Sequence, residues 1–279
     1  MKKLILFLTM AIAVSAKAQV PYAQSLEKGA AVDTAKYKVT YQLKYKDHPD
    51  DKTYKEDTRI VLIGGKTVKD YSDILLHFDS LKTESERRGD ETYANPSGNP
   101  WPVELTEYVR NKKADVKYRL PIMTGTLCYS DTLPSLAWNY MSEQNDTILG
   151  YECQKATATF AGRTYTAWFT TEIPLPYGPY KFGGLPGLIL RIQDADRQYS
   201  WECMGFERSA SPIMQYEYDN EKKCSPDEAG KTIARYYKSP YSFLSAGGAR
   251  IMVRGADGKF RSSADVEEQS IPYKPLELK

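Results

Sequence analysis

A strict alternation of residue types near the N-terminus is the feature that most constrains the fold. Residues 37–45 read YKVTYQLKY, so Tyr, Val and Leu occupy every other position, with Lys, Thr and Gln between them. Successive side chains of a β-strand point to opposite faces of a sheet, and Tyr, Val and Thr fit a pleated surface well. The pattern therefore predicts a strand with one buried and one solvated face.

Further segments rich in Thr, Val and aromatic residues predict more strands, at residues 58–63, 66–68, 148–160, 163–170, 188–192 and 198–206. Gly64-Gly65 and Ala161-Gly162 join two pairs of these segments, and glycine accepts the positive φ of tight hairpin turns. Residues 163–170 carry aromatic side chains on both faces, which requires a layer covering the sheet. We expect a mainly β fold: a curved antiparallel sheet, open or half-barrel-like, with a few helices packed on one face.

The clearest helix signal is the sequence SPDE at residues 225–228. The serine is suited to cap a helix, the proline fits the first helical position, and the glutamate completes a capping box. We expect this helix to run to about Lys238, because Pro240 ends it. Weaker signals predict helices at residues 80–88 and 104–112.

Residues 1–18 have the features of a secretory signal peptide. Lys2 and Lys3 precede an apolar run at residues 4–14, and Ala16-Lys17-Ala18 fits the small-x-small cleavage pattern. The apolar run is shorter than the roughly 20 residues that span a bilayer. We expect cleavage after Ala18 and an exported mature chain, in the periplasm or associated with the outer membrane, with no transmembrane segment.

The expected mature chain, residues 19–279, is nearly neutral. Residues 1–18 hold three of the 38 Lys and Arg residues and none of the 36 Asp and Glu residues, so 35 basic and 36 acidic residues remain. Nucleic acids and anionic membrane surfaces attract clustered positive charge, so we expect no nucleic acid as a partner. Because no linker or low-complexity tract divides residues 19–279, we expect a single β-rich domain.

The chain has four cysteines, Cys128, Cys153, Cys203 and Cys224, all in the expected exported part. An even number of cysteines in an oxidising compartment predicts two disulfides, with three possible connectivities. Buried free thiols are the alternative. The wide spacing of the cysteines and the presence of only two histidines give no metal-site pattern, so we expect no bound metal.

The sequence KFGGLPGLILRI at residues 181–192 concentrates glycine and proline ahead of an apolar run. Residues 185–188, LPGL, have the chemistry of a type II turn. We interpret this Pro/Gly segment as a corner that seats leucines in the core, and the alternative is a loop that contacts a ligand or partner. The candidate binding residues are Lys181, Phe182, Gly184, Leu185, Pro186, Gly187 and Trp168. Lys181 is able to meet an anionic group or to lie at the surface.

Short motifs surround this segment, at Gly150, Tyr151, Cys153, Lys155, Ala156, Gly162, Arg163, 167–170, 173–174, 178–179, 181–182 and 184–189. The last of them, GLPGLI, is the hexapeptide that names the GLPGLI family, and over about residues 147–194 the chain resembles these exported Bacteroidetes proteins, a Porphyromonas-type paralogous family. The resemblance implies a mainly β protein of the cell envelope. It implies no particular biochemical activity.

The sequence carries no nucleophile elbow, zinc-protease motif, P-loop or dinucleotide fingerprint. We therefore expect a non-catalytic binding protein without a cofactor, with a lipid or other apolar ligand, a peptide or an outer-membrane protein as partner. Such a protein needs a concave cavity lined by Tyr and Leu. The alternatives are an unrecognised periplasmic hydrolase, which needs a nucleophile beside a base, and a structural or assembly factor of the envelope.

Overall fold

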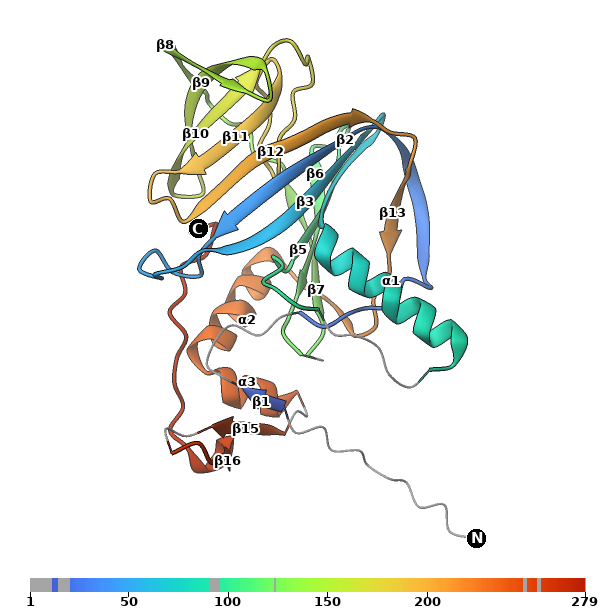
Figure 1. The fold of residues 1–279 in the computed structure, drawn as a ribbon, viewed down its shortest axis with the longest axis vertical. Coiled ribbons are helices and arrows are strands. Elements are labelled where there is room, and N and C mark those ends of the chain that lie inside the picture. Colours follow the sequence, from blue (N-terminus) through green and yellow to red (C-terminus); the bar gives the residue numbers. More distant parts are fainter. Residues whose placement is uncertain are drawn as a thin grey trace.

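The structure is a computed structural model that describes the backbone of residues 12–14 and residues 21–90, 96–122, 124–247, 250–254 and 257–278. The described chain forms a 13-stranded sheet, a 3-stranded sheet and three α-helices (Figure 1). The prediction of a mainly β fold with an open sheet is confirmed. The predicted cleavage site after Ala18 lies outside the described residues.

The large sheet consists of two antiparallel meanders, β2–β7 and β8–β12, which join where β2 pairs with β12. Its strands are β2 (Gly29–Tyr45), β3 (Lys55–Gly64), β4 (Thr67–Ser72), β5 (Val103–Tyr108), β6 (Lys113–Arg119), β7 (Thr126–Thr132), β8 (Asn139–Ile148), β9 (Tyr151–Phe160), β10 (Arg163–Thr170), β11 (Leu188–Asp194), β12 (Tyr199–Arg208), β13 (Pro212–Tyr216) and β14 (Glu221–Lys223). β13 pairs with the first part of β2, and β14 is parallel to β7. The outermost strands, β14 and β8, do not pair with each other, so the curved sheet is not closed.

The three helices are α1 (Asp73–Arg88), α2 (Pro226–Lys238) and α3 (Pro240–Ala246). Ser225 and Glu228 form the predicted capping box of α2. The predicted helix at residues 80–88 is the second half of α1, and the helix predicted at 104–112 is wrong, because most of that segment is β5. Alternate residues of β5 face the core, and pairing with β4 and β6 on both sides overrides its weak helical signal.

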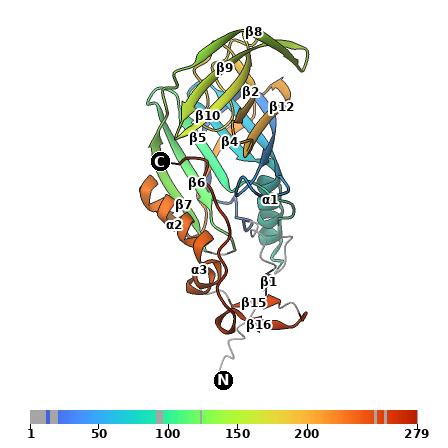
Figure 2. The same ribbon diagram turned by 90° about the vertical axis from the view of Figure 1, so that its left-hand side faces the viewer.

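The helices lie on opposite faces of the large sheet (Figure 2). Alternate residues of β2, among them Val39, Tyr41 and Leu43, belong to the main apolar core, which the buried side chains of α2 also join. We call this side of the sheet the inner face. α1 packs on β3 and β4 from the other side, where a smaller apolar cluster contains Ile60 and Leu62. No helix among the described residues is long and apolar enough to cross a membrane.

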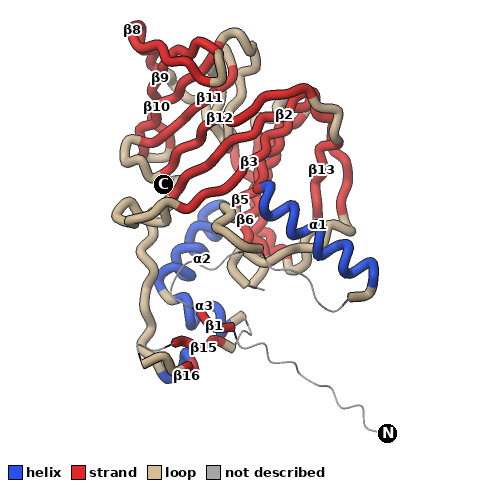
Figure 3. Tube along the Cα trace, in the orientation of Figure 1, coloured by secondary structure: helices blue, strands red, loops and turns tan. Residues whose placement is uncertain are grey.

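The last part of the chain returns to the large sheet without forming a strand. The small sheet of β1 (Ile12–Val14), β15 (Ile251–Arg254) and β16 (Phe260–Ser262) is followed by a 3₁₀ turn at Ser263–Asp265. Residues 271–278, here called the strap, then run as an irregular segment past α2 to the turn between β9 and β10 (Figure 3). The strap connects the helical side of the molecule with the second meander.

Candidate ligand-binding pocket

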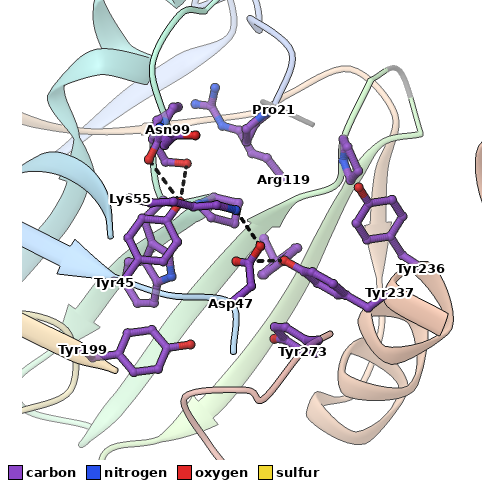
Figure 4. A pocket seen from close by; sticks show the side chains of 15 residues that line it. Pro21, Tyr45, Asp47, Lys55, Asn99, Arg119, Tyr199, Tyr236, Tyr237 and Tyr273 are labelled. Atoms are coloured by element: carbon purple, nitrogen blue, oxygen red, sulfur yellow. Dashed lines mark hydrogen bonds and ion pairs between the residues drawn. The ribbon is translucent and has the colours of Figure 1, made fainter. Parts of the chain in front are cut away.

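A pocket with a free volume of about 50 Å³ lies between the inner face of the sheet and α2. The residues that line it are Pro21, Tyr45, Asp47, Lys55, Asn99, Pro100, Trp101, Pro102, Tyr118, Arg119, Pro121, Tyr199, Tyr236, Tyr237 and Tyr273 (Figure 4). Six of them are tyrosines, contributed by β2, β6, β12, α2 and the strap. The pocket therefore depends on segments from the whole length of the chain.

One wall of the pocket is formed by Tyr45 and Tyr199. Tyr45 is the last residue of β2, and the strand alternation that buries Val39 also turns Tyr45 inward. Tyr199 opens β12 and pairs directly with Tyr45 in the sheet, so the two rings stack, with their centroids 6.5 Å apart and 7° between their planes. The Tyr45 hydroxyl donates to the carbonyl of Asn99 at 3.0 Å, which fixes the ring.

The opposite wall is formed by Tyr237 of α2 and Tyr273 of the strap. Their rings are nearly parallel, 6° between planes, with centroids 3.8 Å apart. Tyr237 lies on the apolar stripe of α2, which also buries Ile233 and Tyr236 against the sheet. The backbone amide of Ile271 donates to the carbonyl of Tyr237. This hydrogen bond anchors the strap to α2 two residues before Tyr273, the strap residue that lines the pocket.

A single ion pair occupies the space between the two walls (Figure 4). The Lys55 Nζ donates to Asp47 Oδ2 at 2.5 Å, and the Tyr237 hydroxyl lies 3.5 Å from Asp47 Oδ1. Burial raises the pKa of Tyr45 and Tyr237 well above the ordinary phenol value. These hydroxyls are therefore protonated donors at neutral pH. The pocket combines flat aromatic surfaces and phenol hydroxyl groups with one Asp–Lys ion pair at its centre.

The Pro/Gly segment, residues 181–192, lies away from this pocket. Phe182 and Leu185 are core residues, exposed by 2% and 1%, and Trp168 on β10 is buried between the cationic groups of Lys155 and Arg191. None of the candidate binding residues from the sequence lines the aromatic pocket. Their role in binding stays a prediction.

The predicted type II turn at residues 185–188 is wrong. A positive φ occurs at Gly184, at 85°, and at Tyr180 directly before the segment, at 56°, and not at Gly187. Gly187 is required for a different reason, because a Cβ there would lie 1.8 Å from the carbonyl oxygen of Thr170. The segment thus presses its backbone against the end of β10, in agreement with the interpretation as a corner.

Lys181 contacts anionic groups within the chain itself. It is 4% exposed, and its Nζ lies 2.5 Å from Asp131 Oδ2 and 2.7 Å from Glu277 Oε1 of the strap. The hydroxyl of the neighbouring Tyr180 also contacts Glu277. The Pro/Gly segment therefore reaches the strap through a buried cation.

A second buried ion cluster lies beside the first residues of the same segment. Arg59 is fully buried and donates to Asp70 Oδ1 at 2.9 Å, to Asp57 Oδ2 at 3.2 Å and to the carbonyl of Val103 at 2.7 Å. Asp70 also accepts the backbone amide of Tyr180 at 2.7 Å. The segment is thus connected to two separate charged clusters.

The four cysteines are free thiols in the structure, so the predicted disulfides are not formed. Cys153 and Cys203 are buried. Cys128 and Cys224 are half-buried on neighbouring chain segments, but the sulfur of Cys224 points to the carbonyl of Cys128, and the sulfur of Cys128 to that of Thr126. Strand geometry turns these sulfurs toward backbone oxygens rather than toward each other. Among the described residues, no group of three His, Cys, Asp or Glu side chains is arranged to hold a metal ion.

Sequence reasoning placed Tyr45 on the inward-facing side of its strand but missed the pocket that it helps to form. Asp47, Lys55, Tyr199 and Tyr273 had no recognisable motif, and their proximity depends on the pairing of β2 with β12 and on the path of the strap. The only usable signal was the abundance of tyrosine, with 22 residues in the chain.

A family model described as a protein of unknown function (Porph_ging) matches residues 159–191. The matched stretch contains β10 and nearly all of the Pro/Gly segment, including the start of β11, so this part of the chain is similar to a Porphyromonas-type family of unknown function. The GLPGLI name stays a prediction from the sequence. No curated protein matches the chain.

Solved structures with a similar course of the chain include PNGF-II in two crystal forms. The form in space group P21 has a TM-score of 0.44 at 15% identity, over 71% of this chain and 32% of that chain. The form in space group C2 has a TM-score of 0.43 at 15% identity, over 70% and 32%. The chain thus spans about a third of the length of PNGF-II.

Proposed function

We propose that this chain is an exported, non-catalytic binding protein of the cell envelope, and that its aromatic pocket holds a small amphipathic ligand with a flat ring. The observation that carries the proposal is the pair of tyrosine walls, Tyr45 with Tyr199 and Tyr237 with Tyr273, on either side of the Asp47–Lys55 ion pair. The export follows from the signal-like residues 1–18 and stands as part of the proposal.

The chemistry of the pocket supports a small ligand, because small-molecule sites are mostly apolar with a few placed polar groups. The free volume of about 50 Å³ is well below the roughly 300 to 1,000 Å³ of drug-sized sites, so the ligand is either very small or displaces part of the pocket wall. Tyrosine rings offer stacking surfaces for a flat ligand, and their hydroxyls offer hydrogen bonds at the edges. Asp47 and Lys55 would fix the orientation of a ligand that carries both a donor and an acceptor.

The lining residues favour binding over hydrolysis. They include no Ser, Thr or Cys to act as a nucleophile, and their one carboxylate, Asp47, is already paired with Lys55. A hydrolase of the kind considered from the sequence needs a nucleophile within hydrogen-bond reach of a base. The carboxyl of Glu107, whose pKa burial raises to about 8, lines neither this pocket nor two others found among the described residues.

Native mass spectrometry of the protein from its own cell envelope tests the proposal. The full chain should carry an adduct of defined mass that is released on denaturation. A Tyr273→Ala variant should lose the adduct, because one wall of the pocket is removed. Tyr140→Ala is the matched control, since Tyr140 is 59% exposed on β8 and lines no part of the pocket, and it should retain the adduct. A bare mass for the wild type, or retention in both variants, would contradict the proposal.

A further inference from the structure

The strap is held in a way that differs from the rest of the chain. Residues 271–278 form no strand, and among them only Leu276 is buried, at 6% exposure. Backbone amides of Lys274 and Leu278 donate to the carbonyls of Asp47 and Ala161, at 2.7 and 2.9 Å. An extended segment with one buried side chain and scattered backbone contacts has the form of a bound peptide rather than of a core element.

Two buried side chains of the scaffold contact the backbone of the strap. Arg163 donates to the carbonyl of Pro275 at 2.6 Å, and the Gln198 amide donates to the carbonyl of Lys274 at 2.7 Å. Carbonyl groups occur in every peptide, so these contacts recognise an extended backbone independently of its sequence. Arg163 is 5% exposed and Gln198 fully buried, which makes each contact stronger than it would be in water.

These donors keep their positions without the strap. Arg163 also donates to Asp194 Oδ2 at 2.9 Å and to Gln198 Oε1 at 2.7 Å. Gln198 donates in turn to the carbonyls of Lys46 and Asp47, at 2.9 and 3.2 Å. The scaffold thus presents preorganised donors, and preorganisation lowers the free-energy cost of binding.

The end of the strap shows which side chains the site selects. Leu276 fills an apolar position, and the next residue, Glu277, meets Lys181 Nζ at 2.7 Å and the hydroxyl of Tyr180. Lys181 is held from the other side by Asp131, so its ammonium group is fixed when Glu277 leaves. The site therefore has one position for an apolar side chain and an adjacent position for a carboxylate.

We infer that Arg163, Tyr180, Lys181 and Gln198 form a binding site for an extended peptide with an apolar residue directly before a carboxylate residue, and that the strap is its resident, displaceable occupant. Displacement of the strap withdraws Tyr273 from the aromatic pocket, because Tyr273 and Glu277 belong to the same segment. Peptide binding at this site is thereby coupled to the shape of the pocket. The inference does not depend on the ligand proposed for that pocket.

Binding of a labelled peptide to the full chain tests the inference. The probe has the strap sequence IPYKPLEL, and its matched control has Lys in place of the Glu. In the wild type the tethered strap competes at an effective concentration on the order of millimolar. A release variant, Leu276→Ser with Glu277→Lys, should bind the probe at least about tenfold more tightly than the wild type does. Adding Lys181→Met to the release variant should abolish its preference for the probe over the control peptide.

Equal affinity of wild type and release variant, or no preference for the Glu-containing probe over its Lys control, would overturn the inference. Hydrogen exchange on the wild-type chain keeps the test valid when the release variant does not fold. Saturating probe should speed exchange at the amides of Lys274 and Leu278, which Asp47 and Ala161 protect, and should leave exchange in β3 unchanged. Unchanged protection of these strap amides at saturating probe would show that the strap is not displaceable.

Discussion

Two adjacent residues, Tyr180 and Lys181, join the Pro/Gly segment to two charged clusters that differ in character. The Arg59 cluster is closed, because Arg59, Asp57 and Asp70 have side chains exposed by no more than 2% and all three belong to β3 and β4. In the Lys181 cluster the lysine is as deeply buried, but its partners Asp131 and Glu277 are 29% and 28% exposed.

This difference in the exposure of the carboxylates separates a fixed ion cluster from one in which a carboxylate partner is exchangeable. A buried charge whose partners are also buried has no access to water when a partner is lost, so the whole cluster must stay or unfold. A buried cation whose partners reach the solvent is able to exchange one carboxylate for another. We infer that the Arg59 cluster fixes the corner of the sheet and that the Lys181 cluster serves as a contact point.

The largest expected effect is at Arg59. Arg59→Met leaves Asp57 and Asp70 buried without their cation and should lower the free energy of unfolding by about 3 to 5 kcal/mol. Urea denaturation measures the change. Arg191→Met is the matched control, because Arg191 pairs with half-exposed Asp146 and Glu202, and its loss should cost less than about 1 kcal/mol. If both substitutions lower the free energy of unfolding equally, the burial of the carboxylate partners does not determine how much an ion cluster stabilises the fold.

The next effect concerns Glu107, which interacts electrostatically with one residue of each cluster, Asp70 and Lys181. Burial raises its pKa from 4.5 to about 8, Asp70 adds to the increase, and Lys181 opposes it. Between these values the folded chain retains a proton that the unfolded chain has lost, so stability falls as pH rises, by up to about 1.4 kcal/mol per pH unit, and levels off above the folded pKa.

Glu107→Gln removes this titration. Relative to the wild type, the variant should gain up to about 5 kcal/mol near pH 8.5 and should show almost no gain near pH 4.5. Denaturation curves of both proteins across this range measure the difference. A constant difference at every pH would mean that Glu107 ionises normally in the folded chain.

A smaller loss is expected at Lys181. Lys181→Met frees Asp131 and Glu277, and because both carboxylates reach solvent, we expect a loss of only about 1 to 2 kcal/mol in the free energy of unfolding. Exchange at the Leu278 amide should become faster, since the strap loses its terminal anchor. If Lys181→Met lowers the free energy of unfolding as much as Arg59→Met does, the Lys181 cluster is as closed as the Arg59 cluster and its carboxylates are not exchangeable.

The smallest global effect is expected at Glu277. Glu277→Gln preserves the volume and the hydrogen-bonding capacity of the side chain, so global stability should change by less than about 0.5 kcal/mol. The strap alone should open more often, with exchange at its amides faster by severalfold and exchange in β3 unchanged. Denaturation and hydrogen exchange on the same variant separate the two effects, and a uniform change in all regions would contradict a separately opening strap.

The parts of the fold that were predicted correctly depend on contacts between neighbours in sequence. The capping box of Ser225 and Glu228 and the hairpin at Ala161-Gly162 satisfy their backbone groups within a few residues, so their signals are complete in short stretches. β5 was mistaken for a helix because its strand character depends on β4 and β6, which pair with it on both sides.

The candidate sites were harder to predict from the sequence, because the residues that form each site are far apart in the chain. From the sequence, Lys181 was predicted either to meet an anionic group or to lie at the surface, because its contact with Glu277 spans 96 residues and has no local signature. The same holds for Tyr45 and Tyr199, which stack only after β2 has paired with β12. The even number of cysteines predicted two disulfides, but in the structure the directions of the side chains leave all four cysteines as free thiols.

The junction of the two meanders also has a consequence for the order of folding. β2 ends at residue 45, and its partner β12 begins at residue 199, so the junction forms only after a long stretch of chain has been made. Contacts of such high sequence separation form slowly, and chains are synthesised from the N-terminus. Until residues 199–208 arrive, β2 exposes an unpaired edge that is open to association with other chains. The strap, which comes last, docks on a sheet that is already joined.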